Sequence, residues 1–195
     1  ERSRGLGDVY KRQAAPTAGA CGVLPAVLVP YFQKRCRNTD KILKAMYVAA
    51  GIGQIIATRS SISGAAGGCQ AEIGSASSMA AGALTYLQGG NCEQIATAAA
   101  MAMKNLLGLV CDPVAGLVEV PCVKRNVIGT VNAMACADMA MAGIVSRIPP
   151  DQVMDAMKEV GDKMDASLRE TALGGLARTE EGVKIAEKMH ASYEN

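Results

Sequence analysis

The sequence has no tryptophan and a single phenylalanine, Phe32, so aromatic side chains make up only 3% of its 195 residues. It also has a single histidine, His190, in a polar segment near the end of the chain. Ser–His and Cys–His nucleophilic schemes therefore have no support within this chain. The net charge is only +2, and the basic residues are scattered without aromatic neighbours, a pattern that does not indicate nucleic-acid binding.

Long apolar runs are absent as well. The longest candidate for a membrane span, residues 45–57, covers about 13 residues, whereas a helix that crosses a bilayer needs about 20. This run contains Gln54 and two glycines, so it predicts a buried helix instead. No segment with a positive start and an apolar centre opens the chain. We therefore expect no membrane partner and a cytoplasmic protein.

The apolar volume comes from Ala, Met, Leu, Val and Ile, a composition that favours closely packed helices. Helical patterns alternate with glycine-rich breaks, and some of them carry capping signals. Asn91 followed by Gln94 resembles a capping box, and Asp40 is a candidate cap for the helix after it. Only residues 117–123 look strand-like. We predict an all-α fold of buried Ala/Met-rich helices with Gly-rich loops between them.

Residues 1–13 are charged and broken by glycine, unlike the sequence that follows. We interpret them as a non-native or disordered leader, and residues 14–195 as one domain that is long enough for a real core. Within this domain, residues 61–68 contain too much glycine to predict regular structure. Helices are expected over residues 70–87 and 92–110.

Three of the seven cysteines stand out by their context. Cys69 follows two glycines and precedes an expected helix, whose positive end should lower the pKa of the thiol. Cys111 ends an apolar helix and is followed by Asp-Pro, and Cys122 follows Pro121. In each case the backbone can leave regular structure beside the sulfur. Freed amide groups can then hydrogen-bond a thiolate or inorganic sulfide.

The cysteine spacing alone leaves the chemistry open. There is no Cys-x-x-Cys pair, and the three positions fit no general zinc or ferredoxin pattern. Buried thiols and metal ligands both remain, whereas a structural disulfide is disfavoured in a cytosolic protein. The other four cysteines lie in a Gly-rich turn, at two polar or cap positions and in a helix of small residues: Cys21, Cys36, Cys92 and Cys136.

Three longer motifs are more specific: "APTAGACGVLPAVL", "SISGAAGGCQAEIGSASSMAA" and "KNLLGLVCDPVAGLVEVPCVKRN". They closely resemble the alpha chain of iron–sulfur-dependent L-serine dehydratase (L-serine ammonia-lyase), from about residue 14 to the late 180s. The resemblance implies that residues 14–195 are the alpha-type catalytic domain, truncated at its N-terminus relative to family chains. Such a domain is largely helical and works without pyridoxal phosphate.

The resemblance also implies a [4Fe–4S] cluster, surrounded by the helices and loops and held by three cysteines. These positions fall on Cys69, Cys111 and Cys122. One iron has no cysteine and is left for L-serine, on whose hydroxyl it acts as a Lewis acid. A base removes the α-proton, and the dehydrated product gives pyruvate and ammonia. The implied protein partner is a beta chain, or a second copy in a homo-oligomer.

The motif "SISGAAGG" is the candidate substrate pocket of this resemblance. Its serines offer hydroxyl groups, and its glycines let backbone amides approach the substrate carboxylate closely. The alternative is a tight loop that only orients Cys69. The candidate substrate-binding residues are Ser61, Ser63, Gly64, Gly67 and Gly68.

Charged residues near the motifs are further candidates. Lys104 and Lys124 are candidate catalytic residues and, with Arg125, candidate charges for the substrate carboxylate, although each is also typical of a surface or structural cation. Glu72 and Glu119 are candidate polar partners or simply helix-face and loop carboxylates. The base that takes the α-proton is not identified. Two alternative functions remain for this chain. One is a non-catalytic iron–sulfur or zinc module, and the other is a helical interaction subunit with inert thiols.

Overall fold

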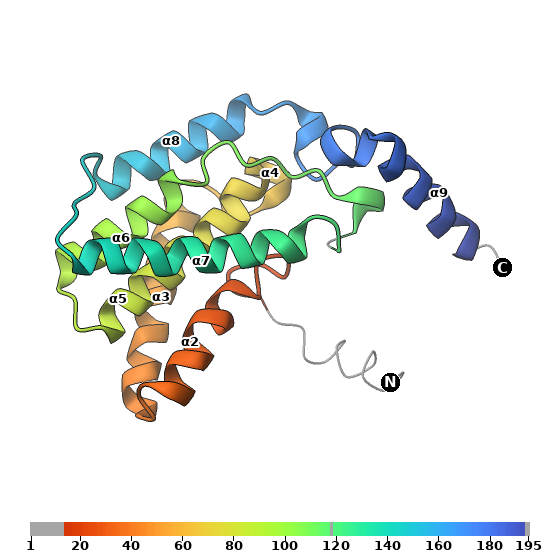
Figure 1. Cartoon of the computed structure of the whole chain (residues 1–195). Helices are drawn as coiled ribbons and strands as arrows, with labels where there is room; N and C mark the ends of the chain where they lie inside the picture. Colours follow the sequence, from red (N-terminus) through yellow and green to blue (C-terminus); the bar gives the residue numbers. More distant parts are fainter. Residues whose placement is uncertain (1–13, 118, 194–195) are drawn as a thin grey trace.

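The computed structural model describes residues 14–117 and 119–193, so the interpretation of residues 1–13 lies outside the described residues. Within that part there is no β-strand, and the only β-bridge joins Cys111 and Arg169. This confirms the predicted all-α class. The helices (Figure 1) are α2 (Val23–Lys34), α3 (Thr39–Arg59), α4 (Gly64–Cys69), α5 (Ser75–Leu87), α6 (Cys92–Lys104), α7 (Cys122–Met141), α8 (Pro150–Lys163) and α9 (Glu180–Tyr193).

Shorter helical turns connect these helices near the cysteines. A π-helix, η1 (Gln70–Gly74), joins α4 directly to α5. Single turns of 3-10 helix follow in the loop before α7 and between α8 and α9, at Val114–Gly116, Ala166–Leu168 and Gly175–Arg178. Short π segments inside helices occur frequently at functional sites, which draws attention to η1.

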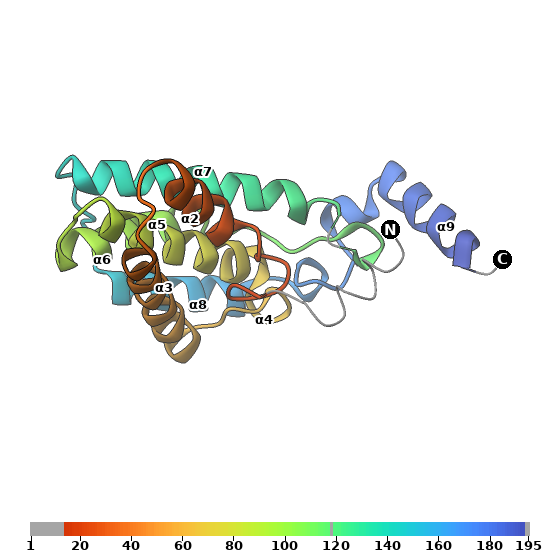
Figure 2. The same cartoon turned by 90° about the horizontal axis from the view of Figure 1, so that it is seen from below.

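Helix α5 lies at the centre of the bundle, in contact with α2, α3, α6 and α7 (Figures 1 and 2). Twelve of its 13 residues are buried, and most are Ala, Ser or Gly, which lets neighbouring helices approach closely. A Cβ on Gly82 would collide with α3. The hydroxyls of Ser77 and Ser78 donate to Gly129 O in α7 and Ala99 O in α6, both at 2.8 Å. The buried polar groups thus hold α5 between its neighbours.

The predicted cap of α6 is confirmed, whereas that of α3 is wrong. Asn91 and Gln94 form the reciprocal capping box before α6. The side chain of Asn38, and not of Asp40, accepts the backbone N–H of Lys41 at the start of α3. Asp40 lies within the first turn, where its charge still favours the helix dipole.

Two loop predictions are also wrong. Residues 61–68 were expected to be irregular, but α4 begins at Gly64. It packs against α8 so closely that a Cβ on Gly161 would lie 2.9 Å from Gly67 Cα, so tertiary packing overrides the low helix propensity of glycine. The described residues of the strand-like segment 117–123 form no strand. Val114 N donates to Val120 O at 2.9 Å, which closes a tight loop before α7.

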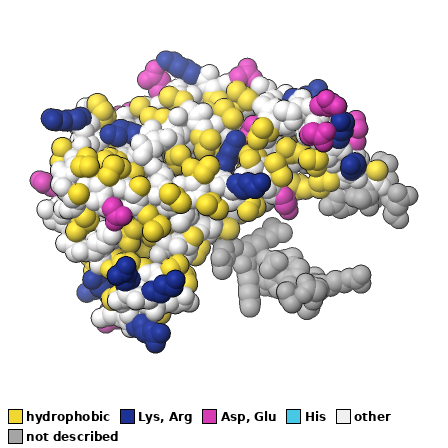
Figure 3. Space-filling model, viewed as in Figure 1, with side chains coloured by type: hydrophobic (Ala, Val, Ile, Leu, Met, Phe, Trp, Pro, Cys, Tyr) yellow, Lys and Arg dark blue, Asp and Glu magenta, His cyan; other side chains and the backbone are white. Residues whose placement is uncertain are grey.

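The surface carries one long apolar row. Val123, Val127, Val131 and Met134 are all exposed and recur at helical spacing along α7. Figure 3 shows hydrophobic side chains gathered over this side of the molecule. Among the described residues, none of the helices combines the length and the apolar character that crossing a membrane requires.

Candidate metal centre

Three chain segments bring Cys69, Cys111 and Cys122 together. Cys69 ends α4, Cys111 lies in the loop between α6 and α7, and Cys122 is the first residue of α7. Their exposed fractions are 0, 2 and 3%. The sulfurs of Cys69 and Cys111 lie within 4.8 Å of each other, and the thiols of Cys69 and Cys122 are close enough to shift each other's pKa. The three cysteines selected from the sequence therefore meet at one buried point, while their role as ligands stays a prediction.

Gly68 sets the direction of the chain at Cys69. It has a φ of 75°, which interrupts the helix immediately before the cysteine. A Cβ on Gly68 would lie 2.7 Å from the sulfur of Met164 and 2.9 Å from Leu109 O. Any side chain at this position would therefore push the Cys69 backbone away from the loop that carries Cys111.

Gln70, the residue after Cys69, hydrogen-bonds to two segments that pack around it. Its side chain is buried, donates to Met157 O in α8 at 3.0 Å and accepts Gly108 N at 2.9 Å. Its backbone N–H donates to Leu109 O at 2.9 Å. Gln70 thus joins η1, α8 and the loop before Cys111 in one hydrogen-bonded unit.

The loop around Cys111 is held by backbone bonds. Cys111 N donates to Leu168 O at 2.8 Å, and Glu170 N donates to Cys111 O at 2.7 Å. The helix expected to run up to Cys111 ends earlier, at Lys104. The chain then turns through Gly108, whose φ of 84° does not continue a helix.

Cys122 is joined to the start of the described chain by Asn126. The Asn126 amide donates to Cys122 O at 2.9 Å and to Gly19 O at 2.7 Å. Its side-chain oxygen accepts Gly22 N at 3.0 Å. One α7 side chain therefore seats residues 14–22, which carry the "APTAGACG" motif, against the cysteine site.

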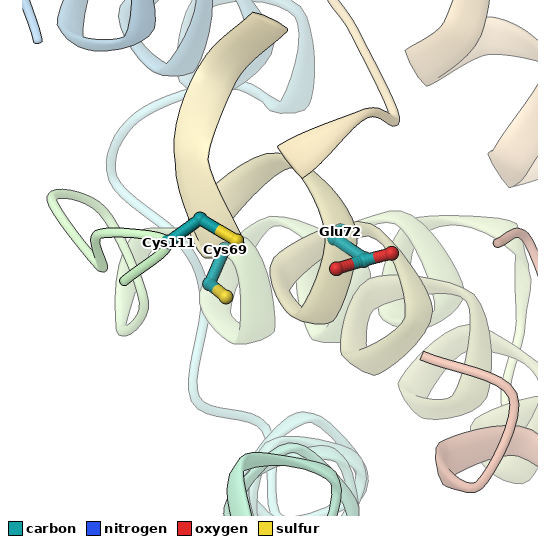
Figure 4. A group of neighbouring side chains, drawn as sticks. All are labelled: Cys69, Glu72 and Cys111. Carbon is teal, nitrogen blue, oxygen red and sulfur yellow. The ribbon is translucent and has the colours of Figure 1, made fainter. Parts of the chain in front are cut away.

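A carboxylate, Glu72 in η1, also reaches the thiols. Glu72 is 8% exposed, and its carboxylate oxygen and the sulfurs of Cys69 and Cys111 all lie within 4.8 Å of one another. Figure 4 shows Glu72 one turn beyond Cys69, with its carboxylate beside the two cysteines. The Thr17 hydroxyl donates to Glu72 Oε1. The sequence left Glu72 among several candidate polar partners, although its i+3 spacing from Cys69 places both on adjacent helix positions.

A half-buried cation, Arg125, also lies beside Cys69. Its Nη1 is 3.6 Å from Cys69 Sγ and donates to Val110 O at 2.8 Å. The same nitrogen is 2.9 Å from Asp112 Oδ1, an ion pair without the alignment of a hydrogen bond. Asp112 Oδ2 accepts Leu176 N at 2.8 Å. Positive charge is therefore fixed beside a sulfur.

The environment raises the pKa of the Cys69 and Cys122 thiols and of the Glu72 carboxylate. Hydrogen bonding with Cys111, together with burial, raises the pKa of Cys69 to about 12. Hydrogen bonding with Cys69, and then burial, raises the pKa of the Cys122 thiol. Burial raises the pKa of Glu72, against the opposing hydrogen bond from Thr17. The lowered pKa expected for Cys69 is therefore wrong, because the neighbouring thiol and burial outweigh the helix end. A bound metal ion reverses this order, since a coordinating thiol is deprotonated.

Of the glycines in "SISGAAGG", Gly64 is the one that faces the site. A Cβ there would lie 3.1 Å from Cys111 Sγ and 3.4 Å from Glu72 Oε2. Gly67 and Gly68 are buried against α8 and the loop before Cys111 instead. Close packing is therefore enough to explain why these two positions are glycine, without a bound substrate.

The two serines of the same motif are placed differently. Ser61 accepts Ser63 N at 3.1 Å. Ser61 also lines a cavity of about 280 Å³ together with Gly67 and residues of α8, and the three thiols are not among its walls. Substrate binding by Ser61, Ser63, Gly64, Gly67 and Gly68 stays a prediction.

The candidate catalytic lysines do not contact the thiol site through any interaction seen in the described residues. Lys104 donates to Ser146 Oγ at 3.0 Å and lies near Cys136. Lys124 is exposed. The cation at the site is the next residue, Arg125.

The remaining cysteines lie apart from this cluster of thiols or at its edge. Cys92 is exposed, Cys36 is half-buried, and Cys136 is buried, with its pKa raised by burial to about 11. Cys21 is half-buried and lines a cavity of about 350 Å³ that Cys122 also borders. His190 is exposed on α9.

The chain matches known proteins over most of its length. The family model described as "Serine dehydratase alpha chain" matches residues 11–177. "Probable L-serine dehydratase, alpha chain" from Bacillus subtilis (strain 168) is 54% identical over 176 residues, which cover 90% of this chain and 59% of that protein. The protein of the same description from Latilactobacillus sakei is 54% identical over 172 residues, which cover 88% of this chain and 82% of that protein.

"L-serine dehydratase 1" from Escherichia coli (strain K12) is 47% identical over 165 residues, which cover 84% of this chain and 36% of that protein. The chain thus spans 59% of the Bacillus relative and about a third of the Escherichia relative. All three cysteines of the buried site lie within the region that the family model matches. The chain belongs to the serine dehydratase alpha-chain family.

Proposed function

We propose that this chain is the cluster-binding part of an iron–sulfur-dependent L-serine dehydratase, which converts L-serine to pyruvate and ammonia. The observation that carries the proposal is the meeting of three buried thiols, from three separate segments, in a chain of this family. The names of the relatives support the reaction, and the arrangement of the thiols supports an iron–sulfur cofactor.

The donor set fits an iron–sulfur cluster. Thiolate sulfur is the ligand type that holds such clusters, and three cysteines leave one iron without a cysteine. A closed zinc site is a poorer fit, because it commonly adds a fourth cysteine or a histidine. The single histidine, His190, is exposed on α9. We assign Cys69, Cys111 and Cys122 as the residues that would hold a [4Fe–4S] cluster.

The protein groups around the thiols have distinct roles in this proposal. When bound, the cluster would supply a Lewis acid that makes the serine hydroxyl a better leaving group. Arg125 offsets the negative charge of the Cys69 thiolate through its contact at 3.6 Å. Burial of the thiols excludes water, which strengthens the electrostatic interactions inside the site. Gly64 lets the α4 backbone lie close to Cys111 and Glu72, since a Cβ there would be 3.1 Å from Cys111 Sγ.

The substrate, partner and location follow as parts of the same proposal. L-Serine is the substrate, and a beta chain or a second copy of this chain completes the enzyme. Lys104 and Lys124 gain no support from their positions, so the base that removes the α-proton has no assignment among them. A cytoplasmic location fits seven cysteines that are all free in the structure.

The test is anaerobic reconstitution of the chain with ferrous iron and sulfide, followed by addition of a beta chain and L-serine. We expect a chain that retains both iron and sulfide, and pyruvate formation that depends on serine. A cluster-containing chain without pyruvate formation would instead favour a non-catalytic module. A chain that retains no iron would refute the cluster assignment and favour inert thiols.

A further inference from the structure

Glu72 is a buried carboxylate that lies close to two cysteine sulfurs and forms no ion pair among the described residues. It lies in η1, within 4.8 Å of the sulfurs of Cys69 and Cys111. The proposed function uses three thiols and assigns no protein donor to the remaining iron. The role of this carboxylate is therefore still to be explained.

No cation pairs with Glu72 among the ion pairs of residues 14–117 and 119–191. The nearby guanidinium, Arg125, is paired with Asp112 at 2.9 Å instead. The other carboxylate close by, Glu170, adds repulsion. Burying a carboxylate without a cation is costly, so a bound metal ion would supply the missing positive charge.

The two oxygens of Glu72 have different surroundings. Thr17 donates its hydroxyl to Oε1, and Gly19 lies close to the whole carboxylate, since a Cβ there would be 2.7 Å from Oε1 and 2.9 Å from Oε2. Asn126 fixes this segment through Gly19 O at 2.7 Å. Oε1 is thus held by the protein, as the outer oxygen of a metal-bound carboxylate commonly is.

The second oxygen, Oε2, and Cys111 Sγ both lie beside Gly64. A Cβ on Gly64 would be 3.4 Å from Glu72 Oε2 and 3.1 Å from Cys111 Sγ. The absence of a side chain at Gly64 therefore lets an oxygen donor and a sulfur donor lie close to the same backbone position. Oε2 does not receive the Thr17 hydroxyl, so it is the oxygen that we assign as the metal donor.

From these contacts, we infer that Glu72 is the protein's oxygen donor to the iron that no cysteine holds, in the absence of serine. The inference rests on the proposed cluster and adds a ligand to it. Thr17 and Gly19 position the donor. L-Serine would then replace a carboxylate oxygen at that iron with its own oxygen, a ligand exchange in which no electrons are transferred.

Glu170 provides a matched control, because it is the other carboxylate beside Gly64. Its Oε2 would lie 3.3 Å from a Cβ on Gly64. Unlike Glu72, it is exposed, and its backbone has a φ of 64°. Water can solvate this carboxylate, so it needs no metal ion for charge balance.

The experiment compares E72Q and E170Q with the unmodified chain after anaerobic reconstitution and removal of loose iron. Iron per chain is measured, together with the EPR signal of three-iron clusters. We expect about four irons in the unmodified chain and in E170Q, and about three, with a strong three-iron signal, in E72Q. Thr17→Val, which leaves the carboxylate but removes its hydroxyl donor, should give an intermediate iron content.

Circular dichroism shows whether E72Q folds. If it does not fold, the iron content of Thr17→Val decides the question. Loss of iron from Thr17→Val alone would then support the assignment, and full retention would overturn it. If E72Q folds and keeps its iron while serine turnover falls, Glu72 is no ligand and the inference is overturned, whereas the proposed function stands. If the unmodified chain binds no cluster, both fail.

Discussion

At the residue scale, two charged side chains of the candidate site lie close in the sequence to a cysteine of that site. Arg125 and Glu72 each follow a site cysteine by three positions, Cys122 and Cys69, respectively. That spacing places them on adjacent positions of one helix, so each reaches the same point as its cysteine. The charge environment of the site is therefore encoded locally, beside the predicted ligands.

The first prediction separates ligand cysteines from structural ones. Cys111→Ala should abolish retention of the cluster, because one of three thiolates is lost. Cys136→Ala removes an equally buried thiol that lies in a different cluster of polar contacts, with Asn105 and Asn132, and should leave iron content unchanged. The measurement is iron per chain after anaerobic desalting. Equal iron content in the two variants would refute the choice of ligands.

The second prediction concerns Arg125. Arg125→Gln should lower the free energy of unfolding by about 3 kcal/mol, because Asp112 would stay buried without its cation. Lys124→Gln changes the preceding, exposed residue and should change the same quantity by less than about 0.5 kcal/mol. Urea unfolding at neutral pH measures both. Similar midpoints and slopes for the two variants would show that the Arg125 ion pair contributes nothing.

The third prediction uses the space beside Cys111. Gly64→Ala places a methyl group 3.1 Å from Cys111 Sγ, so the variant should fold but lose iron severalfold faster to a chelator. Gly51→Ala is the control, because no atom lies within 4 Å of its Cβ position. It should keep iron normally and gain about 0.5–1 kcal/mol of stability from helix propensity. Equal iron loss in both variants would rule out crowding at Gly64.

At the element scale, short segments around the π-helix η1 determine where the cysteines lie. Gln70 bonds to α8 and to the loop before Cys111, and Asn126 bonds residues 14–22 to α7. These are side-chain contacts between segments far apart in the sequence. They explain how a loop, a helix end and a helix start come together.

The fourth prediction tests the Asn126 contact. Asn126→Ala removes two donated bonds and one accepted bond, and should destabilise the chain by about 1–3 kcal/mol. Val127→Ala, at an exposed position of the same helix, should change stability by less than about 0.5 kcal/mol. Thermal unfolding followed by circular dichroism gives both values. A tolerant Asn126 would mean that residues 14–22 are seated by packing alone.

The sequence predicted helices correctly where local signals determine them. It failed where packing against another helix determines them. The capping box of Asn91 and Gln94 is a local pattern, and the structure confirms it. Helix α4 was missed, because its glycines are poor helix formers. Its close contact with Gly161 of α8, which leaves no room for side chains, explains the glycines and is visible only in the structure. Residues 117–123 look strand-like in the sequence, but their described residues form no strand, since a β-rich stretch without a partner strand has nothing to pair with.

At the scale of the whole molecule, the Ala-rich composition was enough to predict the all-α class. Small side chains let α5 sit between four neighbours with its Ser hydroxyls bonded to their carbonyls. The meeting of the three cysteines could not be derived from spacing, because Cys69 and Cys122 are far apart in the sequence. The family motifs supplied that grouping, and the structure adds Glu72 and Arg125 to it.

We propose that the thiols of Cys69, Cys111 and Cys122 hold a [4Fe–4S] cluster with one iron open to serine. The Mössbauer spectrum of the chain, reconstituted with Mössbauer-active iron, should be recorded before and after addition of L-serine. We expect a cluster spectrum in which about one iron in four changes on addition of serine and the others do not. A chain without cluster iron, or a cluster whose spectrum is the same with and without serine, would contradict it.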